Sequence, residues 1–246
     1  VGVLLLDARI PRASLGQGLA ELMRTRPVVY ALNKADLADP VWTARWQAHL
    51  GQAVTLEAQS GRGVQALLDL CLQVGRPRLR MNRPVRLAVL GIPNVGKSSF
   101  LNRVAGRRAA AVGDKPGITR ARQWVRARPD LEILDLPGLL QPRLGEPGVG
   151  LLLSLMAAIK DEIEGREELA REAIRVLEIR YPGRLGERYG IEPTGDLQQD
   201  LENIGRARGH LLAGDRVDTE RAAAALLSDL RGGRLGRITL ESPGST

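Results

Sequence analysis

The sequence predicts an α/β fold, with a mostly parallel sheet that carries helices on both faces, followed by an all-helical domain. Short apolar segments alternate with amphipathic, helix-period segments through the first half of the 246 residues, which is typical of right-handed βαβ units. Near residue 147 the pattern changes, and only helix-period segments follow. The net charge is +11 over residues 1–150 and −3 over residues 151–246. We therefore predict two domains, 1–146 and 147–246.

The elements of the first domain are predicted from their period and their boundaries. The predicted strands are 1–7, 27–33, 53–58, 85–92, 122–127 and 131–136. The predicted helices are 14–25, 40–50, 63–74 and 97–106. The segment 75–84 is basic, begins with glycine and contains two prolines, so we predict a linker between two halves of the domain.

The second domain is predicted from helical periodicity alone. Its helices are expected at 149–163, 166–181, 196–212 and 218–231. Asp196 and Asp218 are predicted N-caps, because a side-chain oxygen at that position accepts hydrogen bonds from the first N–H groups of a helix. Gly214 and Gly232 are predicted to end the helices that these caps begin.

The single cysteine and the lengths of the apolar runs limit the kinds of protein that this chain can be. Cys71 is the one cysteine and lies on an apolar helical face, so it is predicted to be a buried packing residue. No disulfide framework is possible, and a cytoplasmic protein is expected. No apolar run approaches the roughly 20 residues that cross a membrane. The first strand begins abruptly at Val1, and we expect further residues upstream.

A phosphate-binding loop is predicted at Gly91–Ser98, "GIPNVGKS", which fits the pattern G-x-x-x-x-G-K-[ST] between a strand and a helix. Its glycines let successive N–H groups point at phosphate oxygens, and the following helix adds its positive end. Lys97 is expected to reach the β- and γ-phosphates, and the Ser98 hydroxyl to bind Mg²⁺. The loop residues expected to contact the nucleotide are Asn94, Val95, Gly96, Lys97, Ser98 and Ser99.

A guanine-reading loop is predicted at Asn33-Lys34-Ala35-Asp36, after an apolar strand. The Asp36 carboxylate can pair with both the ring N–H and the amine of guanine, whereas adenine would leave it unpaired. Asn33 is expected to hold the loop and reach the base, and the stem of Lys34 to lie over the ring. The alternative is a helix cap, but the phosphate loop in the same half favours the guanine reader.

A third loop should complete the base pocket after the next strand. GTPases have Ser-Ala-Lys there, and the aligned residues here are Glu57-Ala58-Gln59. The backbone N–H of Ala58 can still be offered to the base, although the serine and the lysine are missing. We therefore predict a degenerate form of this element.

Two nucleotide-sensing segments are predicted after the phosphate loop. Asp135 begins "DLPG" and is expected to hold a water bound to Mg²⁺, while the N–H of Gly138 meets the γ-phosphate. Thr119 follows Ser98 by 21 residues, which suits a hydroxyl that binds Mg²⁺ only when the γ-phosphate is present.

The motif order is guanine reader, base-pocket loop, phosphate loop, threonine and Asp-x-x-Gly. An ordinary GTPase with its old ends joined, and cut after Asp-x-x-Gly, has this order. The chain resembles the circularly permuted ribosome-assembly GTPases, above all ribosome biogenesis GTPase A, in "DARIP", "NKADL", "GIPNVGKSS", "KPGIT", "DLPG", "YPGRLGERYG" and "GRLGRITLE". The resemblance covers nearly the whole chain and implies GTP hydrolysis during late assembly of the large ribosomal subunit.

Some residues depart from the patterns of GTPases. Leu136 replaces the threonine of the family's Asp-Thr-Pro-Gly, and Leu139 stands where many GTPases have a water-orienting glutamine. The resemblance implies a catalytic histidine upstream of Val1, so no catalytic group is assigned within the chain, and His49 and His210 are expected to be surface or packing residues. Slow intrinsic turnover, stimulated by the ribosome, is expected.

Asn94 resembles the position that helps to hold K⁺ in cation-dependent GTPases, and a loop-stabilising side chain is the alternative. The expected cofactors are therefore GTP or GDP and Mg²⁺, with K⁺ depending on the role of Asn94.

A polyanionic partner is indicated by residues 76–128, which contain 14 basic residues and one acidic residue, Asp114. Ribosomal RNA would be held through its phosphates, because aromatic residues are only 3% of the chain and base stacking would need more of them. The alternative for this segment is a solvated arginine-rich face. We expect a monomer with no membrane span. The competing functions are a nucleotide-gated RNA-binding module with little hydrolysis and a GTPase of RNA modification or metabolism.

Overall fold

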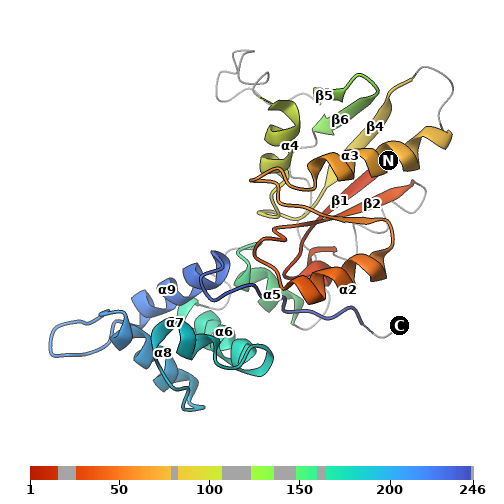
Figure 1. Ribbon diagram of the computed structural model, residues 1–246. Coiled ribbons are helices and arrows are strands. Elements are labelled where there is room, and N and C mark those ends of the chain that lie inside the picture. Colours follow the sequence, from red (N-terminus) through yellow and green to blue (C-terminus); the bar gives the residue numbers. More distant parts are fainter. Residues whose placement is uncertain (16–25, 79–82, 107–122, 136–147, 160–164, 245–246) are drawn as a thin grey trace. The chain divides into compact units, whose positions relative to one another are not determined.

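The computed structural model describes residues 1–15, 26–78, 83–106, 123–135, 148–159 and 165–244 (Figure 1). The chain divides into two compact units. The first comprises Val1–Gly145 together with Glu241–Thr246, and the second comprises Glu146–Leu240. The last six residues therefore group with the first unit, whereas the sequence pattern placed them in the helical domain.

The first unit is built on a six-stranded sheet with the order β3-β2-β1-β4-β6-β5. All neighbouring strands are parallel except β5 and β6, which are antiparallel. The strands are β1 (Gly2–Asp7), β2 (Val28–Asn33), β3 (Ala53–Thr55), β4 (Val85–Leu90), β5 (Gln123–Arg128) and β6 (Leu131–Asp135). The predicted, mostly parallel α/β fold is thereby confirmed.

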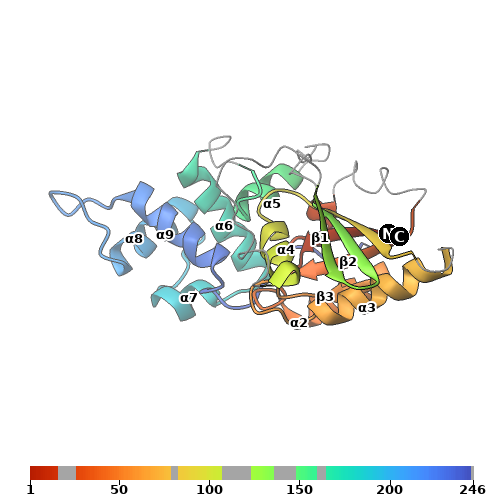
Figure 2. The same ribbon diagram turned by 90° about the horizontal axis from the view of Figure 1, so that it is seen from above.

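Helices α2 (Pro40–Leu50), α3 (Val64–Gly75) and α4 (Lys97–Ala105) belong to this unit (Figures 1 and 2). Helix α2 connects β2 to β3, moving away from the centre of the sheet, whereas α3 returns across it to β4. Right-handed connections in opposite directions place these two helices on opposite faces. Residues 11–15 are also helical, but the rest of the helix predicted at 14–25 lies outside the described residues.

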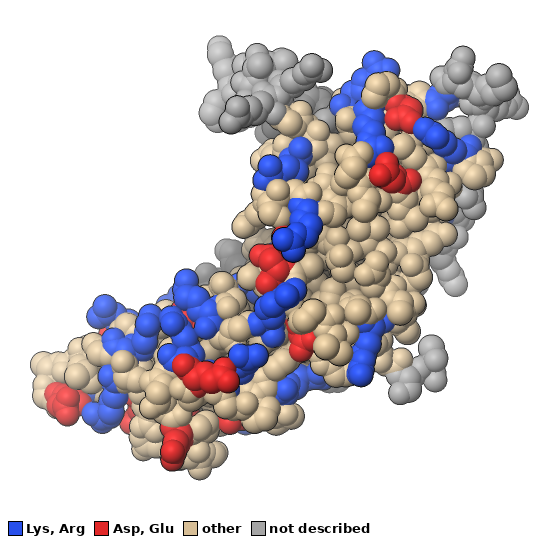
Figure 3. Space-filling view, in the orientation of Figure 1, with Lys and Arg blue, Asp and Glu red and all other residues tan. Residues whose placement is uncertain are grey.

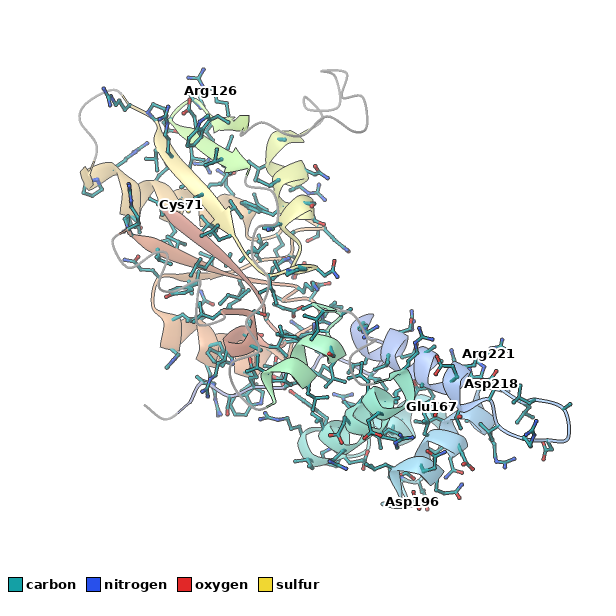
Figure 4. The ribbon with its side chains drawn as sticks, turned by 180° about the vertical axis from the view of Figure 1, so that it is seen from behind. Cys71, Arg126, Glu167, Asp196, Asp218 and Arg221 are labelled. Carbon is teal, nitrogen blue, oxygen red and sulfur yellow. The ribbon has the colours of Figure 1, made fainter. Side chains whose placement is uncertain are left out.

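The core of the first unit lies between the central strands and α3. Every residue of β1 is buried, as expected for a parallel strand covered on both faces. Helix α3 contributes a buried face that includes Leu67, Leu68 and Cys71. Cys71 has no exposed surface (its place on α3 is marked in Figure 4), and burial raises the pKa of its thiol to about 12. The predicted packing role of this cysteine is confirmed.

The second unit is helical throughout its described regular elements. Its helices are α5 (Val149–Leu155), α6 (Arg166–Arg180), α7 (Arg184–Tyr189), α8 (Leu197–Ala207) and α9 (Thr219–Arg231). Helices α6, α8 and α9 pack against one another (Figures 1 and 2). They bury leucines such as Leu177, Leu201 and Leu226. Helix α7 was not predicted, because six residues are too few to show a helical period.

The predicted N-caps of α8 and α9 are confirmed (Figure 4). The Asp196 carboxylate accepts hydrogen bonds from the N–H groups of Gln198 and Gln199, at 2.9 and 3.1 Å. The Asp218 carboxylate accepts one from Arg221 N–H at 3.0 Å. Each cap satisfies N–H groups that have no partner within the helix.

The predicted stop at Gly232 is confirmed, because this residue caps the end of α9. The stop predicted at Gly214 is wrong. Helix α8 ends at Ala207, and Leu211 then pairs with Val217 across a turn. The Asp218 N–H donates to the His210 carbonyl at 2.9 Å, so backbone pairing takes the chain out of the helix before Gly214.

Further boundaries differ from the sequence pattern. Helix α5 ends at Leu155, where the pattern predicted a helix that continues to residue 163. Strand β3 ends at Thr55 rather than at residue 58, because the chain turns where Glu57 pairs with Arg62. In the predicted linker at 75–84, residues Arg76–Arg78 form a 3₁₀ turn, and 79–82 lie outside the described residues. None of the described helices is both long enough and apolar enough to cross a membrane.

Candidate nucleotide-binding site

The candidate site lies along one edge of the sheet, where the parallel strands β1, β2, β4 and β6 end. Asp7 is the last residue of β1 and Asn33 the last residue of β2, and the strand register pairs them. The phosphate loop follows directly after Leu90, which ends β4. Chain connections leave β1 and β4 in opposite directions, and sheets of this kind bind ligands in the crevice at such a point.

The phosphate loop packs closely against β1. A Cβ atom placed on Gly91 would lie 2.7 Å from the Leu5 carbonyl oxygen, so only glycine permits this approach. The backbone turns through positive φ at Asn94 (57°) and at Gly96 (103°), as N–H groups that converge on an anion require. Helix α4 then begins at Lys97, and no side chain caps its first turn. Its N-terminal N–H groups are therefore directed toward the expected phosphates.

The residues predicted to contact phosphate differ in exposure as their roles require. Val95 is buried and fixes the loop to the core, whereas Ser98 is exposed at the first turn of α4. Lys97 and Ser99 are half-buried. A hydroxyl at Ser98 is thus accessible to a ligand.

One buried amide joins three loops of the site. Asn33 Nδ2 donates to the Val95 carbonyl oxygen at 2.8 Å, and Asn33 Oδ1 accepts from the Ala58 N–H at 2.9 Å. The side chain is 2% exposed, so these bonds are shielded from water. A Cβ atom on Gly96 would lie 2.3 Å from Asn33 Nδ2. The guanine-reading, base-pocket and phosphate loops are therefore fixed to one another.

Asp36 is exposed, while Ala35 beside it is buried and its N–H donates to the Leu56 carbonyl at 3.2 Å. The guanine-reading loop is thus anchored through its backbone and presents the Asp36 carboxylate to solvent. This arrangement leaves the carboxylate accessible for pairing with the edge of a base.

The base-pocket loop revises one predicted contact. The Ala58 N–H is already donated to Asn33 Oδ1, so it is not directed at a base. The next residue, Gln59, is exposed, and its N–H has no hydrogen-bond partner within the described part of the chain. The loop itself is closed by backbone bonds between Glu57 and Arg62. In this loop the Gln59 N–H, rather than the Ala58 N–H, is therefore left available to a ligand.

A hollow of about 430 Å³ adjoins this loop. It is lined by Ala58, Gln59, Ser99, Asn102, Arg103 and Gly106. Arg103 donates a hydrogen bond to the Gln59 carbonyl oxygen, so helix α4 supports the loop from the other side. The hollow belongs to the same site, because its walls are the base-pocket loop and the phosphate-loop helix.

An ionic network that the sequence motifs did not reveal lies beneath the guanine reader. The Asp7 carboxylate accepts from Arg9 Nε at 2.9 Å and from Arg9 Nη2 at 2.8 Å, and Lys34 Nζ lies 2.9 Å from its Oδ2. Burial by itself raises the pKa of Asp7, but Arg9 and Lys34 outweigh it and hold the pKa below its usual value. Asp7 is therefore ionised. The sequence did contain one sign of this network, which is that Asp7 ends β1, the strand beside β2.

Part of the predicted site is not described. Thr119 and Gly138 lie outside the described residues. Asp135 ends β6, and β6 pairs in parallel with β4, so its backbone lies at the same sheet edge as the phosphate loop. Within the described ranges, no three His, Cys, Asp or Glu side chains gather as a metal site, but a Mg²⁺ ion held by hydroxyls and phosphates does not need such a cluster.

Comparisons with known proteins agree with this geometry. Residues 86–180 match the family model described as 50S ribosome-binding GTPase. Ribosome biogenesis GTPase A of Bacillus cereus is 36% identical over 251 residues, which is 97% of this chain and 85% of that protein.

Two solved structures are also similar. GDP-bound YlqF is 25% identical, with a TM-score of 0.73 and coverage of 98% of this chain and 94% of that one. GNP-bound YlqF from T. maritima is 24% identical, with a TM-score of 0.73 and coverage of 100% and 93%.

The family match begins in β4, so the guanine reader on β2 precedes it in the sequence although β1 alone separates β2 from β4 in the sheet. This is the arrangement of a permuted P-loop GTPase fold. With 36% identity over nearly the whole length of both chains, the chain belongs to the ribosome biogenesis GTPase A family.

Proposed function

We propose that this chain binds and hydrolyses GTP in the cytoplasm while it assists late maturation of the large ribosomal subunit. The observation that carries the proposal is the Asn33 side chain, which fixes the guanine reader to the phosphate loop. One nucleotide can then be held at its base and at its phosphates together. The ribosomal part is supported by the names of the relatives and of the matching family.

The base would be read by two loops. Asp36 accepts hydrogen bonds from the ring N–H and the amine of guanine, and the Gln59 N–H donates to the guanine carbonyl oxygen. Lys34 lies over the ring, and Asn33 keeps the loops in register. An adenine would present an acceptor to Asp36 and leave that carboxylate unpaired, which explains the selectivity for guanine.

The phosphates would be held by backbone N–H groups from Asn94 to Ser99 and by the ammonium of Lys97. Ser98, Thr119 and Asp135 offer the hydroxyl and carboxylate oxygens that Mg²⁺ prefers. When bound, Mg²⁺ neutralises charge on the phosphates. Asn94 either helps to hold K⁺ or stabilises the loop.

Turnover would be slow without a partner. Leu139 follows Gly138, and a leucine side chain cannot orient a water molecule. We propose that the ribosome stimulates hydrolysis and that the catalytic histidine implied by the family precedes Val1.

Ribosomal RNA would bind through residues 76–128. Several described arginines here pair with acids outside the segment, as in Arg86–Glu132 and Arg128–Asp69 (Figure 3 shows the two signs interspersed on one face). Arg83 and Arg126 are exposed and are better placed to meet phosphates. Arg126 is marked in Figure 4.

The first test is the rate of GTP hydrolysis in K⁺ buffer, with and without purified large ribosomal subunits, for this chain and for one extended upstream. We expect the subunits to bind in a salt-sensitive way and to stimulate the extended chain. The matched variant is Asp36→Asn, which should bind GTP more weakly and bind XTP instead. Xanthine presents a carbonyl where guanine has its amine, and the asparagine amide can donate a hydrogen bond to that carbonyl.

Each other outcome assigns a different function. Subunit binding without stimulated turnover of either chain would favour the nucleotide-gated module, which the leucine at 139 also suits. Turnover without subunit binding would favour a GTPase of RNA modification or metabolism. GTP binding that is unaffected by Asp36→Asn would contradict the assignment of the guanine reader.

A further inference from the structure

Asp7 is a buried carboxylate at the meeting point of β1 and β2 that contacts no predicted phosphate-binding residue. It is 2% exposed, yet it lies at the end of β1, where the chain connections diverge. Its partners are Arg9, which is 1% exposed, and Lys34 of the guanine reader. A fully buried ion pair can be replaced by apolar residues without loss of stability, so stability alone does not account for it.

We propose that Asp7 is a positioning residue that holds the Lys34 side chain across the floor of the guanine pocket. This inference rests on the proposed function, because it concerns how the same site holds its base. The Lys34 stem begins at the end of β2, and its ammonium is held 2.9 Å from a carboxylate at the end of β1. The stem therefore crosses the ends of two neighbouring strands.

The backbone and the burial of Lys34 support this role. Lys34 has a φ of 59°, which is uncommon for a residue other than glycine and directs the side chain away from the ordinary strand direction. Its side chain is 23% exposed. A free lysine populates many rotamers and loses that freedom when a ligand binds, whereas a lysine already held by Asp7 loses little.

Arg9 makes Asp7 a fixed anchor. Its guanidinium bonds to both carboxylate oxygens and its backbone N–H donates to Oδ1 at 3.1 Å, so the carboxylate cannot rotate freely. With two cations on one carboxylate, the trio carries a net charge of +1. The pocket floor therefore stays positive beside an anionic nucleotide, which a simple Asp7–Lys34 pair would not achieve.

The test must separate positioning from stability, because Asp7→Asn alone would remove the carboxylate that neutralises the buried Arg9. The comparison is therefore between Asp7→Asn/Arg9→Met and Arg9→Met, since neither variant contains the buried arginine. Affinities for GDP and IDP are measured by calorimetry, after circular dichroism has shown that both variants are folded. We expect the double variant to bind both nucleotides roughly tenfold more weakly than Arg9→Met.

Measuring both GDP and IDP distinguishes two possible causes of weaker binding, the loss of the Lys34 floor and the displacement of Asp36. IDP lacks the amine that Asp36 reads but keeps the ring over which Lys34 lies. A lost floor therefore weakens GDP and IDP by the same factor. A displaced Asp36 instead weakens GDP more than IDP, because it pairs with the ring N–H of both bases but with the amine of guanine alone, and that result would overturn the proposal. Equal binding of GDP by the two variants would overturn it too.

A second variant covers the case in which the double variant does not fold. Asp7→Glu keeps the charge that Arg9 requires and moves the carboxylate by one methylene. We expect it to weaken GDP and IDP equally, and unchanged affinity would count against positioning. Failure of the proposed function is recognised separately, because the unsubstituted chain would then not bind GDP at all.

Discussion

At the scale of single residues, the site depends on groups whose hydrogen-bonding capacity matches their place. Asn33 must donate to a carbonyl and accept from an N–H at the same time, and its amide supplies a separate donor and acceptor for the two bonds. An aspartate would repel the Val95 carbonyl, and a leucine would leave both backbone groups unpaired. The residue is thus as much a structural link between loops as a contact for a base.

Replacing Asn33 by alanine is expected to weaken both folding and nucleotide binding. Two buried backbone groups, the Val95 carbonyl and the Ala58 N–H, would lose their partners, at a cost of about 1–3 kcal/mol in the free energy of unfolding. The affinity for GDP should fall by at least about tenfold, because the three loops are no longer held in register. Urea unfolding and calorimetric titration with GDP measure the two effects.

The matched control for that substitution is Asn203→Ala. Asn203 accepts a hydrogen bond from Gln199 on the exposed face of α8, so its loss should change stability by less than about 0.5 kcal/mol. If Asn33→Ala behaves like this control, the amide does not hold the loops together.

At the scale of elements, the conformation of the phosphate loop requires glycine at positions where a Cβ atom would clash with neighbouring residues. Gly96 and Gly106 begin and end the region of α4, and both have positive φ, 103° and 63°. A Cβ at Gly96 would meet Asn33 Nδ2, whereas a Cβ at Gly106 would meet nothing within 4 Å. The two positions therefore separate backbone strain from steric conflict.

Alanine at these two glycines is expected to give different results. Gly106→Ala should lower the free energy of unfolding by about 1–3 kcal/mol, because a φ of 63° with a ψ of −175° is a backbone region that residues other than glycine rarely occupy. Gly96→Ala should lower the free energy of unfolding by at least as much again. It should also abolish GDP binding, because the new Cβ would displace the Asn33 side chain. Unfolding and titration with GDP are the measurements, and equal behaviour of the two variants would show that Asn33 yields without consequence.

A contact from the far end of the chain supports the first unit. The Glu241 carboxylate accepts hydrogen bonds from the N–H groups of Arg12 and Ala13, at 2.7 and 3.1 Å, at the start of the helical residues 11–15. The Glu241 carbonyl accepts from Trp46 Nε1 at 3.1 Å. Glu241 therefore caps a helix more than 200 residues earlier, which gives a physical reason for the end of "GRLGRITLE" and for the grouping of the last residues with the sheet.

The sequence correctly predicted those features that depend on residues close together in the chain. The period and the turn residues placed α2 at Pro40–Leu50 and gave the N-caps at Asp196 and Asp218, because each of these depends on neighbours in the sequence. The Glu241 cap, the Asp7–Lys34 pair and the engagement of the Ala58 N–H with Asn33 join residues at least 25 positions apart. No period or spacing encodes such pairings, so they required the fold.

At the scale of the whole molecule, the two units differ in what stabilises them. The first packs helices against a parallel sheet, whereas the second packs helices against one another, around leucines and around buried carboxylates such as Asp229. Asp229 is 1% exposed and is bound by Arg188, Arg234 and the Tyr189 hydroxyl. The strings "YPGRLGERYG" and "GRLGRITLE" thus supply the partners of one acidic residue on α9.

Asp229 should make the helical unit sensitive to acid. Burial by itself raises the pKa of Asp229, but hydrogen bonds from Arg188, Arg234 and Tyr189 outweigh it and lower the pKa below the usual value of 3.8. A carboxyl with a lowered folded-state pKa stabilises the fold above its usual pKa and loses this contribution as the pH falls through the folded value. The contribution is therefore complete at neutral pH and disappears in strong acid.

The variant Asp229→Asn isolates this contribution. At about pH 7 it should lower the free energy of unfolding of the helical unit by about 1–3 kcal/mol, because buried partners lose a charged acceptor. The gap between the variant and the parent should then close as the pH falls below the usual pKa of 3.8 and through the lowered folded-state pKa, where the parent loses the same charge. All three tryptophans, Trp42, Trp46 and Trp124, lie in the first unit, so tryptophan fluorescence follows that unit while far-UV circular dichroism also follows the helices. We expect the substitution to shift the dichroism transition and to leave the fluorescence transition in place. A gap that stays constant with pH would mean that the charge of Asp229 is not what stabilises the unit.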